Sequence, residues 1–483
     1  MKPRILMVSS EANPWAKSGG LADVLEALPA ALAALGHPVA VVIPRYMAAR
    51  NAPARRILDG LPIALGPDIY EVSIWQLLRG TMKSDVTLFF VDQPALFDRQ
   101  GLYNDRNGDF PDNHIRFAIL SRAALEIARR VFPTDIFHCH DWQTALLPVY
   151  LKDDRVIDPT FAGTRSILTI HNLGYQGIFA PEVLGEIGLP KTIFHPGAIE
   201  FWGKVNFLKA GIVFADALTT VSRKYAEEIQ TREYGVGLEG VIASRRNALT
   251  GILNGIDYDR WNPARDHLIP AHYSPADLSG KARCKRELVH AMGFPEAALE
   301  RPLIGVVSRF ATQKGFDLLA EAGPAIFSKD VYLAALGNGE PKIEAIFRDL
   351  QSRFPGKVAV RFGYDESMAH RIEAGSDIFL MPSRYEPCGL NQIYSLRYGT
   401  VPVVRATGGL DDTITSAPAS EATGFKFVAY NGDALREAVE EACRLREDRE
   451  AWTAMMRRGM QKDFSWAASA AAYSRLYCSL VNP

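Results

Sequence analysis

A lysine, two glycines and the predicted start of a helix come together near the N-terminus of this chain. Lys17, Gly19 and Gly20 follow the apolar run 5–9, so a strand, a glycine turn and a helix are predicted in succession. Glycine lets the backbone approach a ligand closely, and the first amides of a helix are unpaired and carry the positive end of its dipole. The turn therefore predicts a site for an anion such as a sugar diphosphate. An ordinary strand-to-helix turn is the alternative, since the spacing is neither GxGxxG nor that of a P-loop.

A matching cationic loop follows an apolar run in the second half of the chain. Arg309 and Lys314 are five residues apart, beside Gly315. Arginine offers a planar fork and lysine a compact point charge. We expect the two to converge on a diphosphate and to stabilise the negative charge of a departing nucleotide, with solvated surface charges as the alternative. One such half-site in each half of the chain predicts a ligand held in a cleft between two domains.

Further polar residues follow two other apolar runs of the first half. Asp141 and Trp142 come after the run 135–139, and His171 and Asn172 come after the next run. A carboxylate beside an indole suits a sugar, because the ring stacks on an apolar sugar face and the acid accepts hydrogen bonds from hydroxyls. The alternatives are a helix-capping aspartate with a core tryptophan and a structural histidine.

The segment around Glu386 is the most specific in the sequence. Glu386 precedes a proline and the turn residue Gly389, after which a helix is predicted to begin near Asn391. Backbone amides there are predicted to hold a phosphate, and a carboxylate is favoured beside them. Helix capping is the alternative for Glu386, although Ser383 or Asn391 would cap better. Tyr364 is predicted to stack on a nucleobase, with a core tyrosine as its alternative.

Short apolar runs alternate with longer helical patterns along the whole chain. Continuous apolar runs suit strands that are buried on both faces of a parallel sheet. The pattern breaks between about 247 and 300 and then restarts, which predicts two Rossmann-like α/β domains. In such sheets ligands collect beyond the carboxyl ends of the strands, which is where the motifs above fall. The predicted strands are 4–9, 38–43, 86–91, 135–139, 165–170, 217–221, 303–308, 331–336, 358–362, 377–382 and 401–405.

Charge, cysteine content and apolar runs indicate which binding partners and which cellular compartment to expect for this protein. The net charge of -1 argues against a dedicated nucleic-acid binder. The five scattered cysteines show no metal-binding spacing, so we expect reduced thiols, no metal and a cytoplasmic protein. No apolar run approaches the ~18 residues of a membrane span, and the N-terminus lacks a signal-peptide pattern. We therefore expect no membrane and no nucleic-acid partner, and the sequence leaves the oligomeric state open.

Taken together, the motifs resemble those of the bacterial glycogen synthases, the ADP-glucose-dependent glycogen and starch synthases of glycosyltransferase family 5. The resemblance covers essentially the whole chain. It implies the α/β GT-B fold, in which two Rossmann-like domains with parallel sheets face each other across a deep cleft. It implies an acceptor-side domain over 1–248, completed by a C-terminal helix over 465–483, and a nucleotide-sugar domain over 249–464. The motifs that carry it are 17–23, 140–142, 171–173, 254–257, 309–315 and 386–390.

The same resemblance implies an activity. A retaining hexosyltransferase would move glucose from ADP-glucose to the non-reducing end of an α-1,4-glucan such as glycogen or a maltooligosaccharide. The chain would grow by one glucose, ADP would leave, and neither a metal nor another cofactor would be required.

It also implies roles for individual residues. Lys17 and Gly20 would face the diphosphate and glucose, Asn254 would lie on the interdomain side, and Tyr364 would stack on adenine. His171 would place its backbone carbonyl near the anomeric carbon. The implied catalytic residues are His171, Arg309, Lys314 and Glu386. The implied donor-binding residues are Lys17, Gly19, Gly20, Asp23, Asn254, Tyr364, Cys388, Gly389, Leu390 and Asn391. The implied acceptor-binding residues are Asp141, Trp142 and Asn172.

Three positions depart from related patterns. Tyr394 stands where other GT-B enzymes often carry a second glutamate, which favours the glycogen synthase group over sucrose- or trehalose-type transferases. Ser18 and Asn391 stand where some members have threonine. Three rival functions are a transferase that uses UDP-sugars, a glucan phosphorylase with a pyridoxal phosphate lysine, and a glucan-binding protein without catalysis.

Overall fold

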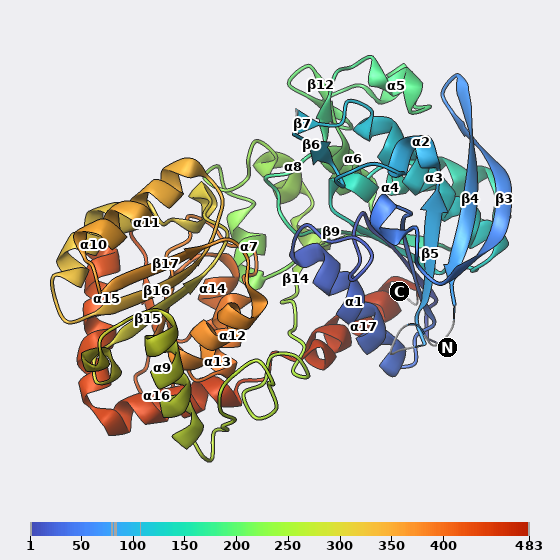
Figure 1. Cartoon of the computed structure of the whole chain (residues 1–483). Helices are drawn as coiled ribbons and strands as arrows, with labels where there is room; N and C mark the ends of the chain where they lie inside the picture. The colour runs from blue at the N-terminus through green and yellow to red at the C-terminus, as the bar shows by residue number, and fades with distance from the viewer. Residues whose placement is uncertain (1, 79–80, 82–84, 107, 482–483) are drawn as a thin grey trace. The chain divides into compact units, whose positions relative to one another are not determined.

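The chain folds into two compact units, seen here in a computed structural model that describes residues 2–78, 81, 85–106 and 108–481 (Figure 1). Unit 1 comprises Met1–Val221, Ala226–Gly255 and Trp466–Pro483. Unit 2 comprises Ser222–Tyr225 and Ile256–Ser465. Each unit is an α/β structure built on a mainly parallel sheet, as the alternation of apolar runs and helical patterns predicts.

Unit 1 is built on a nine-stranded sheet of order β14-β13-β9-β8-β1-β2-β5-β4-β3. All its neighbouring strands are parallel except at the β5-β4-β3 edge, where the pairing is antiparallel. The strands are β1 (Ile5–Val8), β2 (Val39–Pro44), β3 (Ala54–Leu65), β4 (Asp68–Leu77), β5 (Thr87–Asp92), β8 (Ile136–His140), β9 (Arg165–Ile170), β13 (Ala217–Thr220) and β14 (Leu249–Gly251).

The predicted strands of the first half are confirmed, and the differences have a simple cause. Only strands with a continuous apolar run were predicted, and β1, β2, β5, β8, β9 and β13 are buried along nearly their whole length. The strands β3 and β4, the last two at one end of the sheet, carry many exposed polar residues, as one-sided antiparallel strands do, so the apolar criterion missed them. It also missed β14, which has only three residues.

The helices of unit 1 join these strands, and two small sheets lie in its loops. The small sheets pair β6 (Asn104–Asp105) with β7 (Gly108–Asp109), and β12 (Lys204–Asn206) with β10 (Ile178–Phe179) and β11 (Glu200–Phe201). The helices are α1 (Gly20–Ala34), α2 (Pro94–Phe97), α3 (Asn113–Arg130), α4 (Leu147–Ile157), α5 (Val183–Glu186), α6 (Phe207–Phe214), α8 (Glu239–Ser244) and α17 (Trp466–Val481). Helix α7 (Arg223–Glu228) begins in the short piece of chain assigned to unit 2.

The C-terminal helix α17 belongs to unit 1, where it packs against α1. Tyr473 and Tyr477, one helical turn apart, are both buried and join the core that β1, β2 and α1 share. The chain therefore ends in the unit in which it began, directly after leaving unit 2 at Ser465.

Unit 2 is built on a six-stranded, fully parallel sheet of order β17-β16-β15-β18-β19-β20. The five strands predicted for this half are confirmed, and the three-residue strand β20 was missed. The strands are β15 (Leu303–Val307), β16 (Tyr332–Gly337), β17 (Val358–Phe362), β18 (Ile378–Met381), β19 (Val401–Arg405) and β20 (Phe425–Phe427). The helices are α9 (Ser279–Ala291), α10 (Leu318–Phe327), α11 (Pro341–Arg353), α12 (Glu366–Gly375), α13 (Asn391–Arg397), α14 (Gly408–Thr413), α15 (Gly432–Glu447) and α16 (Arg449–Gln461).

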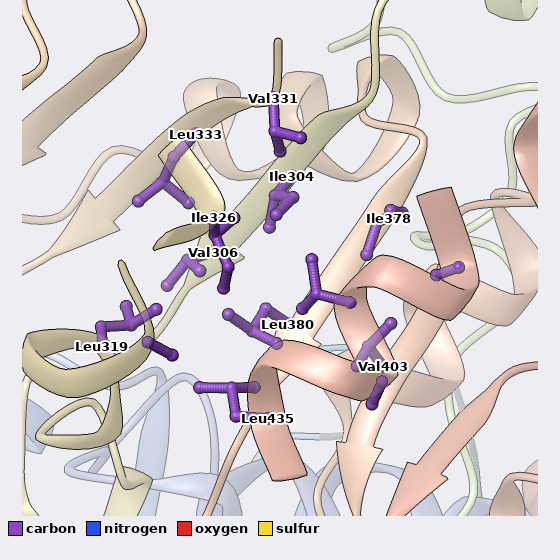
Figure 2. Close-up of a cluster of buried hydrophobic side chains, with 14 of the residues drawn as sticks. Ile304, Val306, Leu319, Ile326, Val331, Leu333, Ile378, Leu380, Val403 and Leu435 are labelled. Carbon is purple, nitrogen blue, oxygen red and sulfur yellow. The ribbon is translucent and has the colours of Figure 1, made fainter. Parts of the chain in front are cut away.

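Both faces of the unit 2 sheet are covered, because successive strand residues point to opposite sides. Ile304, Val306 and Leu380 enter the core formed with α10, α11 and α15 (Figure 2). Leu303 and Phe379, their neighbours in sequence, enter a second core formed with α9 and α12. Burial on both faces is why these strands read as continuous apolar runs.

The strand order in each unit defines where a ligand binds. In chain order, the parallel strands of unit 2 are arranged 3-2-1-4-5-6. The direction of progression reverses between β15 and β18, and in unit 1 it reverses in the same way between β1 and β8. Open α/β sheets bind ligands beyond the carboxyl ends of the strands at such a point. Each unit therefore has one favoured location, formed by the loops after two neighbouring strands.

Candidate active site

In unit 1 the loop after β1 carries the predicted glycine turn. The Lys17 ammonium group lies 2.6 Å from the Asp23 carboxylate, and both side chains are partly exposed. Gly19 and Gly20 have open space where a side chain would stand. Helix α1 begins at Gly20 without a side-chain cap. The turn thus presents a cation beside an uncapped helix N-terminus, as the sequence predicts.

The turn is held by a residue that the sequence analysis missed. The Glu11 carboxylate is buried and accepts hydrogen bonds from the Ser18 amide at 2.6 Å and the Ser18 hydroxyl at 2.5 Å. The Gly19 amide, at 3.3 Å, and the Tyr103 hydroxyl, at 2.6 Å, also donate to it. Glu11 belongs to no spacing motif, and its role depends on Tyr103, which is far away in sequence. Ser18 acts here through its hydroxyl, which a threonine would also supply.

The loop after β9 is fixed by Asp141, which follows β8. One oxygen of the Asp141 carboxylate accepts the amide hydrogens of His171, at 2.7 Å, and Asn172, at 3.4 Å. The pKa of Asp141 is raised to about 7, because burial and, to a smaller extent, the charge of Glu11 outweigh the lowering by these two amides. Asp141 occupies the capping position of the short 3-10 turn Trp142–Thr144, but its side chain makes no capping hydrogen bond there, which gives the helix-capping alternative no support. Its backbone φ of 58° belongs to the left-handed region, an uncommon conformation for a residue other than glycine.

Trp142 is packed by aromatic neighbours. Its ring meets Phe117 edge-on, with centroids 5.0 Å apart, and Phe179 at 5.9 Å. Gly177 lies against the indole so closely that a Cβ atom there would stand 2.3 Å from a ring atom. This packing favours the alternative of a core tryptophan, and sugar stacking by Trp142 stays a prediction.

The His171 side chain contacts a histidine that precedes it in β8. His171 Nε2 lies 3.0 Å from His140 Nδ1, and the His140 ring lies 4.2 Å from the ring of His138. Burial lowers the pKa of His138 and of His171 to about 3, and it lowers the pKa of His140 well below its usual value. All three imidazoles are therefore neutral near pH 7.

In unit 2 the two loops at the reversal point bring predicted residues into direct contact. Lys314 follows β15, Glu386 follows β18, and the Lys314 ammonium group lies 2.6 Å from the Glu386 carboxylate. The same carboxylate oxygen accepts a hydrogen bond of 3.0 Å from the Ser383 hydroxyl. Both charged side chains are largely buried, with 18% and 7% of their surfaces exposed. Neither of these contacts of the Glu386 carboxylate is to a helix N-terminus, so the structure gives no support to the alternative that it caps a helix.

Two glycines let the loops of unit 2 approach each other. Gly315 has φ of +72°, and a Cβ atom there would lie 1.9 Å from the Pro382 carbonyl oxygen. Gly408 has φ of +46°, and a Cβ atom would lie 2.0 Å from the Glu386 carbonyl oxygen. No side chain fits at either position, since backbone atoms cannot move aside as a flexible side chain does.

Two predicted residues of unit 2, Arg309 and Tyr364, are exposed. The Arg309 side chain is exposed, and the structure records no ion pair for it among the residues it describes. Tyr364, just after β17, is 80% exposed, so the alternative of a core tyrosine is wrong. Both side chains are therefore open to a ligand.

The turn before α13 is held by hydrogen bonds from the buried side chain of Gln392. Gly389 has φ of +69°, and the buried Gln392 donates to the carbonyls of Cys388 and Gly389 at 3.0 Å each. Asn391 donates to the Val307 carbonyl at 2.6 Å. The helix α13 begins at Asn391 with Leu390 in the capping position and no side-chain cap. Gln392 is a second residue that the sequence analysis missed as a support of the site.

The remaining predicted residue is Asn254 of unit 1. It is buried in the segment after β14, where the neighbouring Leu253 carbonyl accepts a hydrogen bond from Ser469 of α17. Its side-chain oxygen has no hydrogen-bond partner within the described part of the chain. The predicted residues thus form two groups, one in each unit.

Two kinds of feature are absent from the residues that the structure describes. These residues contain no cluster of three or more histidine, cysteine, aspartate or glutamate side chains suited to a metal ion. Within the same described ranges, no helix is both long and apolar enough to cross a membrane.

Comparisons with known proteins match almost the entire chain. A family model described as starch synthase catalytic domain matches residues 4–244, and one described as glycosyl transferases group 1 matches residues 293–458. A protein of Koribacter versatilis named glycogen synthase is 49% identical, over 98% of this chain and 97% of that protein. A glycogen synthase of Myxococcus xanthus is also 49% identical, over 99% of each chain.

Solved structures agree with the sequence relatives. The catalytic domain of starch synthase IV from Arabidopsis thaliana, solved with ADP and acarbose bound, has a TM-score of 0.89 and is 33% identical over 100% of both chains. A sucrose-phosphate synthase from Thermosynechococcus elongatus, with a TM-score of 0.59 and 17% identity over 100% of both chains, shares the fold.

Proposed function

This chain belongs to the family of bacterial glycogen synthases and starch synthases, and we propose that it extends an α-1,4-glucan with glucose taken from ADP-glucose. The fold is GT-B, the activity is that of a glucosyltransferase, and both predictions are confirmed. The proposed acceptor is the non-reducing end of glycogen or a maltooligosaccharide. The new bond keeps the α configuration.

The observation that carries the proposal is the Lys314–Glu386 pair at the reversal point of the unit 2 sheet. Lysine there supplies a positive charge for a leaving diphosphate, while the carboxylate accepts hydrogen bonds from sugar hydroxyls. Arg309 adds a second cation that is open to a ligand. Positive groups aimed at developing negative charge are often the largest single contribution to catalysis.

The groups of unit 1 complete the proposed machinery. Lys17 and the uncapped start of α1 favour a negative ligand. The loop that Asp141 fixes carries His171 and Asn172 toward the sugars. We assign unit 1 to the acceptor glucan and unit 2 to the nucleotide sugar.

The proposed chemistry is front-face attack within an ion pair. Glycosidases that retain configuration use two carboxylates about 5 Å apart, and the motifs identified here offer no such pair. In the proposed step the acceptor 4-hydroxyl oxygen bonds to the anomeric carbon while the bond from that carbon to the β-phosphate oxygen breaks. The hydroxyl proton passes to that phosphate oxygen, so ADP leaves with the proton. The protein contributes position and charge.

We propose that no metal and no cofactor take part, because lysine and arginine supply the cations that a phosphate leaving group requires. We also propose a cytoplasmic location, which the five free cysteines favour.

A donor competition assay tests the function. The enzyme receives equal concentrations of ADP-glucose and UDP-glucose, each with a different isotope, together with maltoheptaose. We expect longer maltooligosaccharides labelled mainly from ADP-glucose. Predominant labelling from UDP-glucose would favour the rival UDP-sugar transferase, and unchanged maltoheptaose with either donor would contradict transferase activity.

A further inference from the structure

A continuous set of buried contacts runs from the C-terminal helix to the loop that carries His171. The Tyr477 hydroxyl of α17 lies 2.8 Å from His138 Nδ1. On the other side of that ring, His138 Nε2 lies 2.6 Å from the Thr169 hydroxyl. Tyr477 and His138 are fully buried, so these contacts are shielded from water. Both nitrogens of His138 are thus engaged, and its ring is held in one orientation.

His138 in turn packs against the histidine that contacts His171. The rings of His138 and His140 are 4.2 Å apart at an angle of 34°, and His140 Nδ1 lies 3.0 Å from His171 Nε2. His140 is fully buried, whereas His171 is half-buried. The His171 ring is therefore fixed from within through Nε2, while the residue as a whole is only partly covered.

The partners of His140 define where the protons lie. A neutral imidazole has one N–H donor and one bare acceptor nitrogen. His140 Nε2 is buried without a hydrogen-bond partner in the part of the chain that the structure describes. Unpaired buried N–H groups are rare, and unpaired acceptors are somewhat less so. The proton of His140 accordingly belongs on Nδ1, where it is donated to His171 Nε2.

We propose that His140 holds His171 in the tautomer that carries its proton on Nδ1, and that Tyr477 and His138 are positioning residues for this pair. His171 then donates a hydrogen bond from Nδ1 to a hydroxyl of the transferred glucose. This inference rests on the proposed function for the identity of that sugar. The tautomer itself does not depend on any ligand.

Tyr477→Phe tests the positioning role, because it removes one hydroxyl and leaves the ring. Tyr150→Phe is the matched control, since Tyr150 is a buried tyrosine of the same unit whose hydroxyl donates to the Ile187 carbonyl, also at 2.8 Å. Small misplacements of catalytic groups cost up to about 100-fold in rate. We expect Tyr477→Phe to lower kcat about tenfold or more, with the KM for ADP-glucose changed by less than about twofold. Tyr150→Phe should keep the wild-type kcat, although we expect it to lose about as much thermal stability as Tyr477→Phe.

Equal kcat values for the two variants, both close to wild type, would overturn the positioning role and leave α17 as packing only. A wild-type enzyme that does not transfer glucose at all would instead contradict the proposed function.

Nitrogen-15 NMR of the substrate-free wild-type protein, with its histidines labelled, tests the tautomer of His171. This test requires neither enzyme activity nor a Tyr477 variant that folds. The His171 signals are identified by their loss in His171→Gln. We expect a protonated Nδ1 and a bare Nε2 for His171. A protonated Nε2 on His171 in the wild-type protein would overturn the proposal. A mixture of the two His171 tautomers would also overturn it if the mixture were the same in His140→Phe.

Discussion

At the scale of single residues, the lysine of each predicted group is paired with a carboxylate, and a buried carboxylate holds the glycine turn. Lys314 pairs with Glu386, Lys17 pairs with Asp23, and Glu11 binds the amides of the glycine turn. Such partners hold the cations in place before a ligand arrives. Preorganised groups need no rearrangement during the reaction, which is why they contribute so strongly to catalysis.

Replacing either cation of unit 2 should therefore lower activity far more than stability. We expect Lys314→Ala and Arg309→Ala each to reduce kcat/KM by about 100-fold to 1,000-fold, or about 3–4 kcal/mol of transition-state stabilisation. Steady-state kinetics with ADP-glucose and maltoheptaose gives the number, and a thermal melt checks folding.

Arg353→Ala is the matched control for Arg309→Ala, because Arg353 is an exposed arginine of the same unit that pairs with Asp349 on α11. It should leave kcat/KM unchanged. Values within threefold of wild type for both Lys314→Ala and Arg309→Ala would count strongly against the assigned roles.

The buried histidines predict how stability responds to acid. Burial lowers the pKa of His138 to about 3 in the folded state, while the usual value of about 6.5 applies when the chain unfolds. The unfolded state therefore binds more protons as the pH falls below about 6.5, and folding loses stability. One such histidine costs about 1.4 kcal/mol between about pH 7.5 and about pH 5.5.

His138→Gln removes this one titration, and urea unfolding at both pH values measures the effect. Asp141, whose pKa burial raises to about 7, acts in the opposite direction, but it is common to both proteins and cancels in the comparison. The stability difference between variant and wild type should shift in favour of the variant by about 1.4 kcal/mol at the lower pH. The same difference at both pH values would mean that His138 is not a buried neutral group.

Residue types predicted which loops of unit 2 come together better than they predicted the residues that support those loops. Lysine, glutamate and glycine in short motifs were sufficient to identify the Lys314 and Glu386 loops. Glu11 and Gln392 were missed because each acts on backbone atoms that only the fold brings near. Trp142 was predicted to stack on a sugar, but its packing favours a core role. Its neighbours Phe117 and Phe179 come from distant parts of the sequence, so no local motif indicated this packing.

At the scale of elements, the site is determined by where strands end. Parallel strands place their carboxyl ends at one edge, and the loops after β15 and β18 meet because those strands are neighbours. Continuous apolar runs predicted these strands because both faces of the sheet are buried. The same criterion failed for β3 and β4, whose exposed residues interrupt the runs.

The close approach of the two loops in unit 2 depends on a glycine. Gly315→Ala would place a methyl group against the Pro382 carbonyl in addition to straining a φ of +72°. Gly293→Ala isolates the strain, because Gly293 has φ of +73° and open space around it. We expect about 1 kcal/mol of destabilisation for Gly293→Ala and about 3 kcal/mol for Gly315→Ala.

Activity should separate the two glycine variants further. Gly315→Ala moves the loop that carries Lys314 and should lower kcat/KM by more than about tenfold, whereas Gly293→Ala should retain wild-type kinetics. Indistinguishable melting temperatures and rates for the two variants would show that the loops do not depend on this contact.

At the scale of the whole molecule, the two units share one arrangement of strands and loops. Each has a parallel sheet whose strand order reverses once, and each carries its chemical groups in the loops at that reversal. Sequence patterns predicted both sheets, because their buried strands are local and continuous in the chain. The placement of α17 on α1 depends on contacts between the two ends of the sequence, which no local pattern contains.

We propose that one glucosyl unit passes from ADP-glucose to a glucan in each turnover. The most direct test measures ADP release and glucan length in the same reaction with maltoheptaose, followed by digestion of the product with an exo-amylase specific for α-1,4 bonds. We expect one ADP for every glucose added and complete digestion of the extension. Release of ADP without extension of the glucan, or binding of the glucan without release of ADP, would contradict the claim.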